Sequence, residues 1–316
     1  MDFVRKIFSV FLLAAAAFTA ANGASDSLRV RQDVLLGDVE FLADSLCAGR
    51  RTGTPGGTEA AAYIMRRFRE CGLSYSVQAF ETATGAVGHN IIAYSGNAFS
   101  GIAHSGQQNI RGEAALRGNA GKTPYIVILA YYDGLGRTGD RFYPGADSNA
   151  SGAAALLALA GRLSGRSDVL LVALDGHNAN SAGAAALSES LRGQRIRMVI
   201  NLDIIGATSS PVDSYWREYL IALGGEAHAR ALERCNSGLG LHLYYDYYRS
   251  RSFTDLFYRR TGDHKPFLDR RIPCVVFTSG ITLDTNRSSD TPASLDYGVM
   301  AKRVELIARW VESLDY

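Results

Sequence analysis

The sequence has almost no excess of charge of either sign. Its 33 Lys and Arg residues face 31 Asp and Glu residues, which gives a formal net charge of +2 over 316 residues. Nucleic-acid-binding chains usually carry a basic excess that neutralises phosphates, so this balance gives no reason to expect such a partner. Hydrophobic residues make up 47% and charged residues 20%, which excludes a disordered, collagen-like or coiled-coil chain.

Long apolar runs are absent beyond the first two dozen residues. Arg5 and Lys6 precede an apolar, alanine-rich stretch from Ile7 to Ala21, and small residues follow as far as Ala24. This pattern is typical of a secretory signal peptide, and the stretch is short for a membrane span; an N-terminal anchor helix is the alternative. We therefore predict a signal peptide at 1–24, a single domain at 25–316, and export to the periplasm or the medium. No membrane span is expected after cleavage.

Cysteine is scarce, and its spacing excludes one kind of metal site. The four cysteines are Cys47, Cys71, Cys235 and Cys274, and no two of them form a CxxC or CxxxC pair, so a thiolate zinc site is not predicted. In an exported chain they could form disulfides in any of three pairings or remain isolated buried thiols. The G-x-S-x-G and H-E-x-x-H motifs of serine hydrolases and zincins are also absent.

Apolar runs bounded by turn residues predict the strands of a buried parallel sheet. They are Tyr125–Tyr131, Val169–Leu174, Met198–Ile204 and Pro273–Thr278, with shorter β-like runs at Ser74–Phe80 and Asn90–Tyr94. Helical periodicity is found at Leu28–Leu46, from Thr58 to Gly72, and at Ser151–Leu163, Ala182–Leu191 and Tyr297–Leu314. The alternation predicts a three-layer α/β fold with a mostly parallel central sheet and helices on both faces.

A tyrosine cluster allows two interpretations. Tyr244, Tyr245, Tyr247 and Tyr248 predict a half-buried strand, because aromatic residues favour such surfaces. The rim of an aromatic pocket is the alternative.

Five segments are expected near the carboxyl ends of the strands, where open α/β sheets place their ligands. They are YYDGLG (131–136), PGADSNASGAAALL (144–157), ALDGHNANSAG (173–183), INLDIIG (200–206) and DTPASLDY (290–297). Together with GRRTGTPGG (49–57) near the start and GDHKPF (262–267) before the last strand, they resemble the exported di-zinc aminopeptidase family, which includes bacterial leucyl aminopeptidases, glutamate carboxypeptidase and the transferrin-receptor ectodomain. The resemblance covers residues 35–316.

The resemblance implies two zinc ions, five protein ligands and a glutamate base, but most of these residues are replaced here. The five ligand positions hold Tyr131, Ser148, Asn178, Asp203 and Asn286, so only Asp203 is retained. His177 occupies the position of the base, Asp133 keeps the carboxylate next to the first ligand, and Asp147 precedes the bridging position by one residue. Tyrosine, serine and asparagine are poor zinc ligands. We therefore expect no metal cofactor and no di-zinc peptidase activity.

The leading hypothesis is an exported pseudo-peptidase with a binding or scaffold role. A cleft lined by Tyr131, Ser148, His177, Asn178 and Asn286 would suit a small polar ligand or a peptide end. One alternative is a rewired hydrolase with Ser148, His177 and Asp203 as nucleophile, base and orienting carboxylate. Others are a single metal held by Asp147, His177 and Asp203, or a residual metallo-aminopeptidase. The sequence does not specify the oligomeric state.

Two carboxylates at neighbouring strand ends would repel each other in a buried site. We therefore expect Asp133 and Asp203 to be solvated, or one of them to pair with His177 as an imidazolium. Asp263 and His264, in the GDHKPF segment, are expected to pack the loop near the site.

Overall fold

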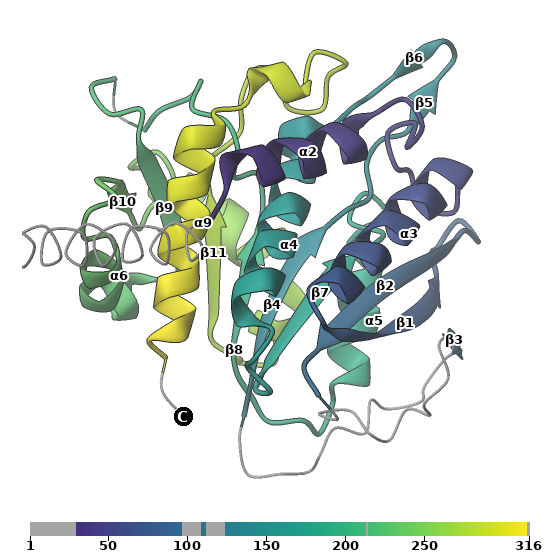
Figure 1. The fold of residues 1–316 in the computed structure, drawn as a ribbon, viewed down its shortest axis with the longest axis horizontal. Helices are drawn as coiled ribbons and strands as arrows, with labels where there is room; N and C mark the ends of the chain where they lie inside the picture. The colour runs from purple at the N-terminus through teal and green to yellow at the C-terminus, as the bar shows by residue number, and fades with distance from the viewer. Residues whose placement is uncertain (1–29, 97–108, 112–123, 213, 315–316) are drawn as a thin grey trace, which may run out of the picture. The chain divides into compact units, whose positions relative to one another are not determined.

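Nine strands form one mixed sheet within residues 30–96, 109–111, 124–212 and 214–314, which the computed structural model describes (Figure 1). The strand order is β10-β9-β11-β8-β4-β7-β2-β1-β3, with five parallel and three antiparallel neighbouring pairs. The strands are β1 (Ser74–Glu81), β2 (Val87–Tyr94), β3 (Asn109–Arg111), β4 (Tyr125–Tyr131), β7 (Val169–Leu174), β8 (Ile196–Leu202), β9 (Tyr219–Leu223), β10 (His242–Tyr244) and β11 (Cys274–Thr278). A separate short hairpin pairs β5 (Arg137–Thr138) with β6 (Arg141–Phe142).

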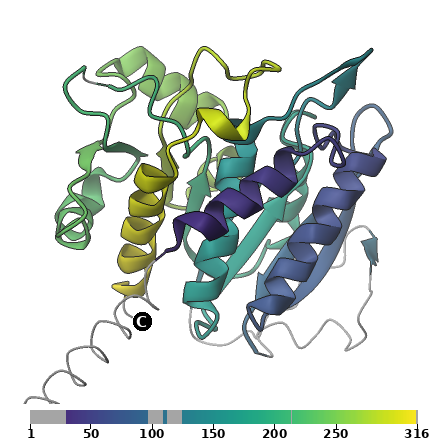
Figure 2. The same cartoon turned by 45° about the horizontal axis from the view of Figure 1, so that its top comes forward.

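Helices cover both faces of this sheet (Figures 1 and 2). One face carries α2 (Gln32–Ala43), α3 (Pro55–Glu70), α4 (Gly152–Leu163) and α9 (Tyr297–Glu312), and the other carries α5 (Ala182–Ser190) and α8 (Lys265–Leu268). The shorter helical segments are η1 (Ala146–Ser151), η2 (Glu226–His228), α6 (Ala229–Cys235), α7 (Arg251–Thr254), η3 (Asp255–Arg260) and η4 (Pro292–Ser294). This arrangement confirms the predicted α/β fold with a mostly parallel sheet.

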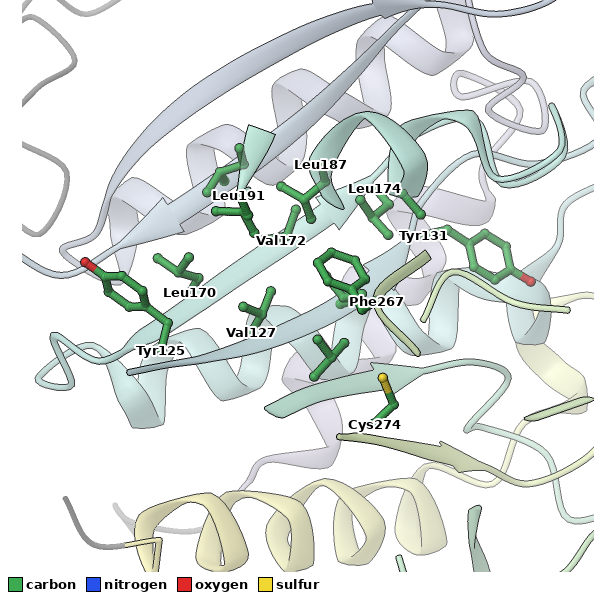
Figure 3. Close-up of a cluster of buried hydrophobic side chains, with 14 of the residues drawn as sticks. Tyr125, Val127, Tyr131, Leu170, Val172, Leu174, Leu187, Leu191, Phe267 and Cys274 are labelled. Carbon is green, nitrogen blue, oxygen red and sulfur yellow. The ribbon is translucent and has the colours of Figure 1, made fainter. Parts of the chain in front are cut away.

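The central strands are buried on both faces, which explains their continuous apolar sequences. All residues of β4 and β7 are buried. Alternate side chains of β4 point to opposite faces, so Val127, Leu129 and Tyr131 join Phe267 in the core beneath α5 and α8. Figure 3 shows Tyr131 at the margin of this cluster, with its hydroxyl directed away from the apolar side chains. The alternation therefore brings a polar group to the carboxyl end of the strand.

The structure differs from the sequence-based expectations at three places. The second helix begins at Pro55 rather than near Thr58, because Thr54 caps it by accepting a hydrogen bond from the Gly57 amide (3.3 Å) and proline suits the first helical position. Strand β9 was not predicted from its short YLIAL sequence. In the tyrosine cluster only Tyr244 belongs to a strand, and Tyr247 instead stacks on Phe257 at a centroid distance of 4.5 Å.

The predicted signal peptide, residues 1–24, lies outside the described residues, and Gln32–Tyr316 forms one compact unit. No helix in the described ranges is long and apolar enough to cross a membrane. Cys47, Cys71, Cys235 and Cys274 are all free thiols, with Cys47 and Cys274 buried. The alternative of isolated thiols is therefore the one that the structure contains.

A fully buried arginine joins the segments that precede the site. Arg50 is 0% exposed, and its guanidinium donates hydrogen bonds to the carbonyl oxygens of Tyr132 (2.7 Å), Leu42 (2.5 Å), Pro144 (2.7 Å) and Gly145 (2.9 Å). These carbonyls belong to the end of α2, the segment after β4 and the segment before η1. Arg50 therefore connects two segments that carry site residues.

We predict that Arg50→Lys destabilises the protein by roughly 2–4 kcal/mol, because a lysine ammonium cannot reproduce a planar fork of hydrogen bonds to four carbonyls. Chemical denaturation followed by circular dichroism measures the effect. The neighbouring exposed Arg51 provides the control: Arg51→Lys should leave the free energy of unfolding nearly unchanged. Equal effects of the two substitutions would contradict the role assigned to Arg50.

Candidate functional site

Three neighbouring parallel strands carry the site residues at their carboxyl ends. Strands β8, β4 and β7 are adjacent in the sheet. Tyr131 ends β4, His177 follows β7 by three residues, and Asp203 comes directly after β8. Because carboxyl ends of parallel strands meet at one edge of a sheet, these side chains come together although they lie far apart in the sequence.

His177 forms an ion pair that determines its charge. Its Nδ1 lies 2.8 Å from Oδ2 of Asp263, whose side chain is 1% exposed, while the His177 side chain is 25% exposed. Burial by itself lowers the pKa of His177, but the charge and hydrogen bond of Asp263, together with Asp203 and Asp133, raise it to about 10. His177 is therefore an imidazolium at neutral pH, and Nδ1 donates the hydrogen bond to Asp263.

Tyr131 packs flat against this imidazolium. The two rings are stacked with centroids 3.7 Å apart and an interplanar angle of 7°. The Tyr131 hydroxyl lies 3.2 Å from the Ser148 Oγ. Burial and the nearby charge of Asp203 raise the pKa of Tyr131 well above its usual range, so it remains a neutral phenol. The stack adds a cation–π attraction to the ion pair.

A short series of hydroxyl groups leads to Asp203. Burial raises the pKa of Asp203 to about 6, while the charge of His177 and a hydrogen bond from Tyr131 lower it. If Tyr131 donates to Asp203, its oxygen can accept from Ser148. The three groups then form a chain from Ser148 through Tyr131 to Asp203, with Asp203 ionised at neutral pH.

Asp133 holds the turn that carries His177. It accepts hydrogen bonds from the amides of His177 (2.8 Å) and Asn178 (3.0 Å) and from Nδ2 of Asn178 (3.2 Å). Burial and the charge of Asp175 raise its pKa to about 6. The Asn178 side chain thus contacts Asp133.

Asp147 is directed into the protein. It is 2% exposed, and its Oδ1 accepts from the amides of Gly206 (2.9 Å) and Ala207 (3.1 Å). Asp290 accepts in turn from the amides of Asp147 (2.7 Å) and Ser148 (3.1 Å). The two carboxylates therefore fix the backbone on which Ser148 stands.

Asn286 lies in an exposed loop between β11 and η4, with a φ of +64°. No hydrogen bond or ring contact joins it to another site residue in the described parts of the chain. Of the eight residues predicted to line the site, Asn286 and Asp147 are the two whose side chains these contacts leave apart from the others.

Comparison with known proteins places this chain in a family. The family model for peptidase family M28 matches residues 113–311, more than half of the chain. The protein belongs to peptidase family M28. This confirms the resemblance drawn from the seven sequence segments.

Solved structures share the M28 fold at low sequence identity. LapA from Legionella pneumophila matches with a TM-score of 0.68 and 15% identity, over 90% of this chain and 73% of LapA. The zinc aminopeptidase BSAP from Bacillus subtilis matches at 0.65 and 13%, over 90% and 95%. Glutaminyl cyclase from Porphyromonas gingivalis matches at 0.62 and 18%, over 90% and 99%. No curated protein matches in sequence. At these identities the structural likeness shows the fold alone.

Two positions that the resemblance assigns to metal ligands hold side chains with other partners. Tyr131 is a neutral phenol and the Asn178 amide donates to Asp133, while His177, at the position of the base, is an imidazolium without a lone pair for a metal. Among the residues that the structure describes, no three His, Cys, Asp or Glu side chains converge as a metal site. Asp147, His177 and Asp203, the predicted single-metal candidates, point to different partners.

The candidate triad has different partners from those expected. Ser148 contacts Tyr131, and the carboxylate bound to His177 is that of Asp263 rather than Asp203 or Asp133. The expectation that Asp133 or Asp203 pairs with His177 is therefore wrong, and Asp263 has a direct role in the site beyond loop packing. In the sequence, the GDHKPF segment was the only signal for Asp263. Nothing linked it to His177, because the two residues are 86 positions apart.

We predict that His177 remains protonated far above pH 7. Its raised pKa contributes stability that is fully present below about pH 6.5 and is lost as the pH rises towards about 10. Nitrogen chemical shifts of the His177 ring, followed from pH 5 to 10.5, measure this directly. In Asp263→Asn the titration should move down by at least one pH unit, and an ordinary midpoint near pH 6.5 in the unsubstituted protein would contradict the ion pair.

Asp147 generates a second pH-dependent prediction. Burial and Asp290 raise its pKa to about 7, so its ionisation costs stability as the pH rises from about 4 to 7. Asp147→Asn keeps an oxygen acceptor for the two amides, and its melting temperature should rise relative to the unsubstituted protein by roughly 5 °C between pH 4 and pH 8. The exposed Asp140→Asn variant should show no such trend. A constant difference across this range would refute the assignment.

Proposed function

We propose that this M28 protein is exported and does not carry out the di-zinc peptidase reaction, but acts as a binding or scaffold protein. The observation that supports this most directly is the ion pair of His177 with Asp263 beneath the Tyr131 ring. These groups stand at the positions of the base, of a supporting loop and of a metal ligand. His177 is hydrogen-bonded to Asp263 and stacked on Tyr131, which leaves its imidazolium no lone pair for a metal ion or for the proton of a nucleophile.

The same charge state argues against a serine hydrolase. A general base must accept the proton of the nucleophile, and an imidazolium held by a buried carboxylate has no free lone pair. Ser148 also makes its hydrogen bond with Tyr131, a neutral phenol. A nucleophilic role for Ser148 therefore has no base to support it.

The site favours a ligand with neighbouring hydrogen-bond acceptor and donor groups. Nε2–H of His177 has no partner among the described residues, and the side chain is 25% exposed. Asp203 is partly exposed and can accept hydrogen bonds beside it. A carbonyl oxygen could accept from His177 while an adjacent N–H donates to Asp203. A peptide or another small amide-containing molecule has this chemistry, in agreement with the polar ligand expected from the sequence.

An activity panel tests the loss of catalysis. The purified full-length protein is assayed with aminoacyl p-nitroanilides, with peptides that carry an N-terminal glutamine, and with esters, after chelator treatment and after zinc addition. We expect no turnover above that of the matched Ser148→Ala and Asp203→Asn variants. Turnover that a chelator abolishes and zinc restores would contradict the proposal, as would ester hydrolysis that Ser148→Ala removes.

Binding is tested separately by titrating short peptides against the protein in calorimetry and NMR. Asp203→Asn should weaken binding about tenfold, because an amide is a weaker acceptor than a carboxylate for a ligand N–H. The control is Asp140→Asn, a substitution of an exposed residue in the β5–β6 turn. This variant should bind the peptides as the unsubstituted protein does. Equal affinity of the Asp203→Asn variant would exclude this site as the binding site.

A further inference from the structure

Three carboxylates from different parts of the fold act on His177: Asp263 contacts its ring, Asp133 accepts from its backbone amide, and Asp203 acts through its charge. Asp133 comes from the end of β4, Asp203 from the end of β8, and Asp263 from the loop before α8. Each of them contributes electrostatically to His177. Asp133 and Asp263 are 0% exposed, so water screens their mutual repulsion poorly.

Such a cluster requires a positive charge close by. Bringing several carboxylates into a buried site is costly, because each loses its hydration and repels the others. Among the described residues, His177 is the cation whose side chain hydrogen-bonds to one of these carboxylates, through the 2.8 Å contact with Asp263, while the buried Arg50 acts on Asp133 only by its charge. Tyr131 covers one face of that ring by stacking, with the two ring centroids 3.7 Å apart. The position of His177 is thus defined from two sides.

We propose that the His177 imidazolium is the built-in cation of this site, which holds Asp133, Asp203 and Asp263 together and makes the fold independent of a bound metal ion. The inference rests on the proposed function, in that the site is taken not to use a zinc pair. It goes further by assigning to one side chain the charge that metal ions supply in zinc enzymes. Its consequence is that removal of this cation creates a site for a divalent cation, because Asp203 and Asp263 then present uncompensated carboxylate oxygens.

The test compares melting temperatures of His177→Gln and the unsubstituted full-length protein, with and without 5 mM Mg²⁺, Ca²⁺ or Zn²⁺. We expect the unsubstituted protein to change by less than about 1 °C on addition of any cation or of chelator. His177→Gln should melt roughly 5–10 °C lower and recover about 3 °C or more with at least one of the cations. Equal melting temperatures of the two proteins, or no recovery with any cation, would overturn the proposal.

A matched control separates charge from loss of ring packing. His242 stacks on Trp216 at the same centroid distance of 3.7 Å, away from these carboxylates, so His242→Gln removes a comparable stack. It should show no recovery with divalent cations. A recovery equal to that of His177→Gln would also overturn the proposal.

A second variant is used if His177→Gln does not fold. The double variant His177→Gln/Asp263→Asn removes one carboxylate together with the cation, so it should regain stability and fold. Asp263→Asn alone should be less stable than the unsubstituted protein. If the double variant also fails to fold, charge compensation is refuted. All readouts of this test are melting temperatures, whereas the proposed function is tested by peptidase turnover. A failure of this inference can therefore be distinguished from a failure of the proposed function.

Discussion

The ion pair between His177 and Asp263 joins the turn after β7 to the loop before α8, 86 residues further along the chain. It sets the charge of the imidazole, and that charge sets the chemistry of its neighbours. Tyr131 stacks on a cation, Asp203 is stabilised as an anion beside it, and Ser148 is left with a phenol as its partner. A site built in this way can present a charged donor and an acceptor side by side, and His177, held as a cation, is not available as a general base.

Three buried carboxylates near the site serve the backbone. Asp133 holds the amides of His177 and Asn178, Asp147 those of Gly206 and Ala207, and Asp290 those of Asp147 and Ser148. A buried backbone amide outside the ladder of the sheet needs an acceptor, and one carboxylate satisfies two such amides at once. These acidic residues therefore have a structural role that needs no metal ion.

Much of the fold was predictable because buried strands have a recognisable apolar sequence pattern. Strands β4 and β7 were predicted with their observed bounds, since continuous apolar runs are what a strand covered on both faces requires. Strand β9 is only five residues long and has no turn signal that separates it from a short helix. For the site, the sequence order brought Tyr131, His177 and Asp203 to one sheet edge, but it could not identify the partner of His177.

The sequence by itself determined the class of fold and the family, and it predicts the replacement of most metal ligands, because each of these depends on residue type at a position along the chain. The tertiary structure alone decided which carboxylate pairs with His177, that Asn178 is bound to Asp133, and that Asp147 faces the interior. The physical reason is that hydrogen bonds and buried charges act over about 3 Å in space. Residues that meet at that distance here come from loops 44, 59 and 86 positions apart.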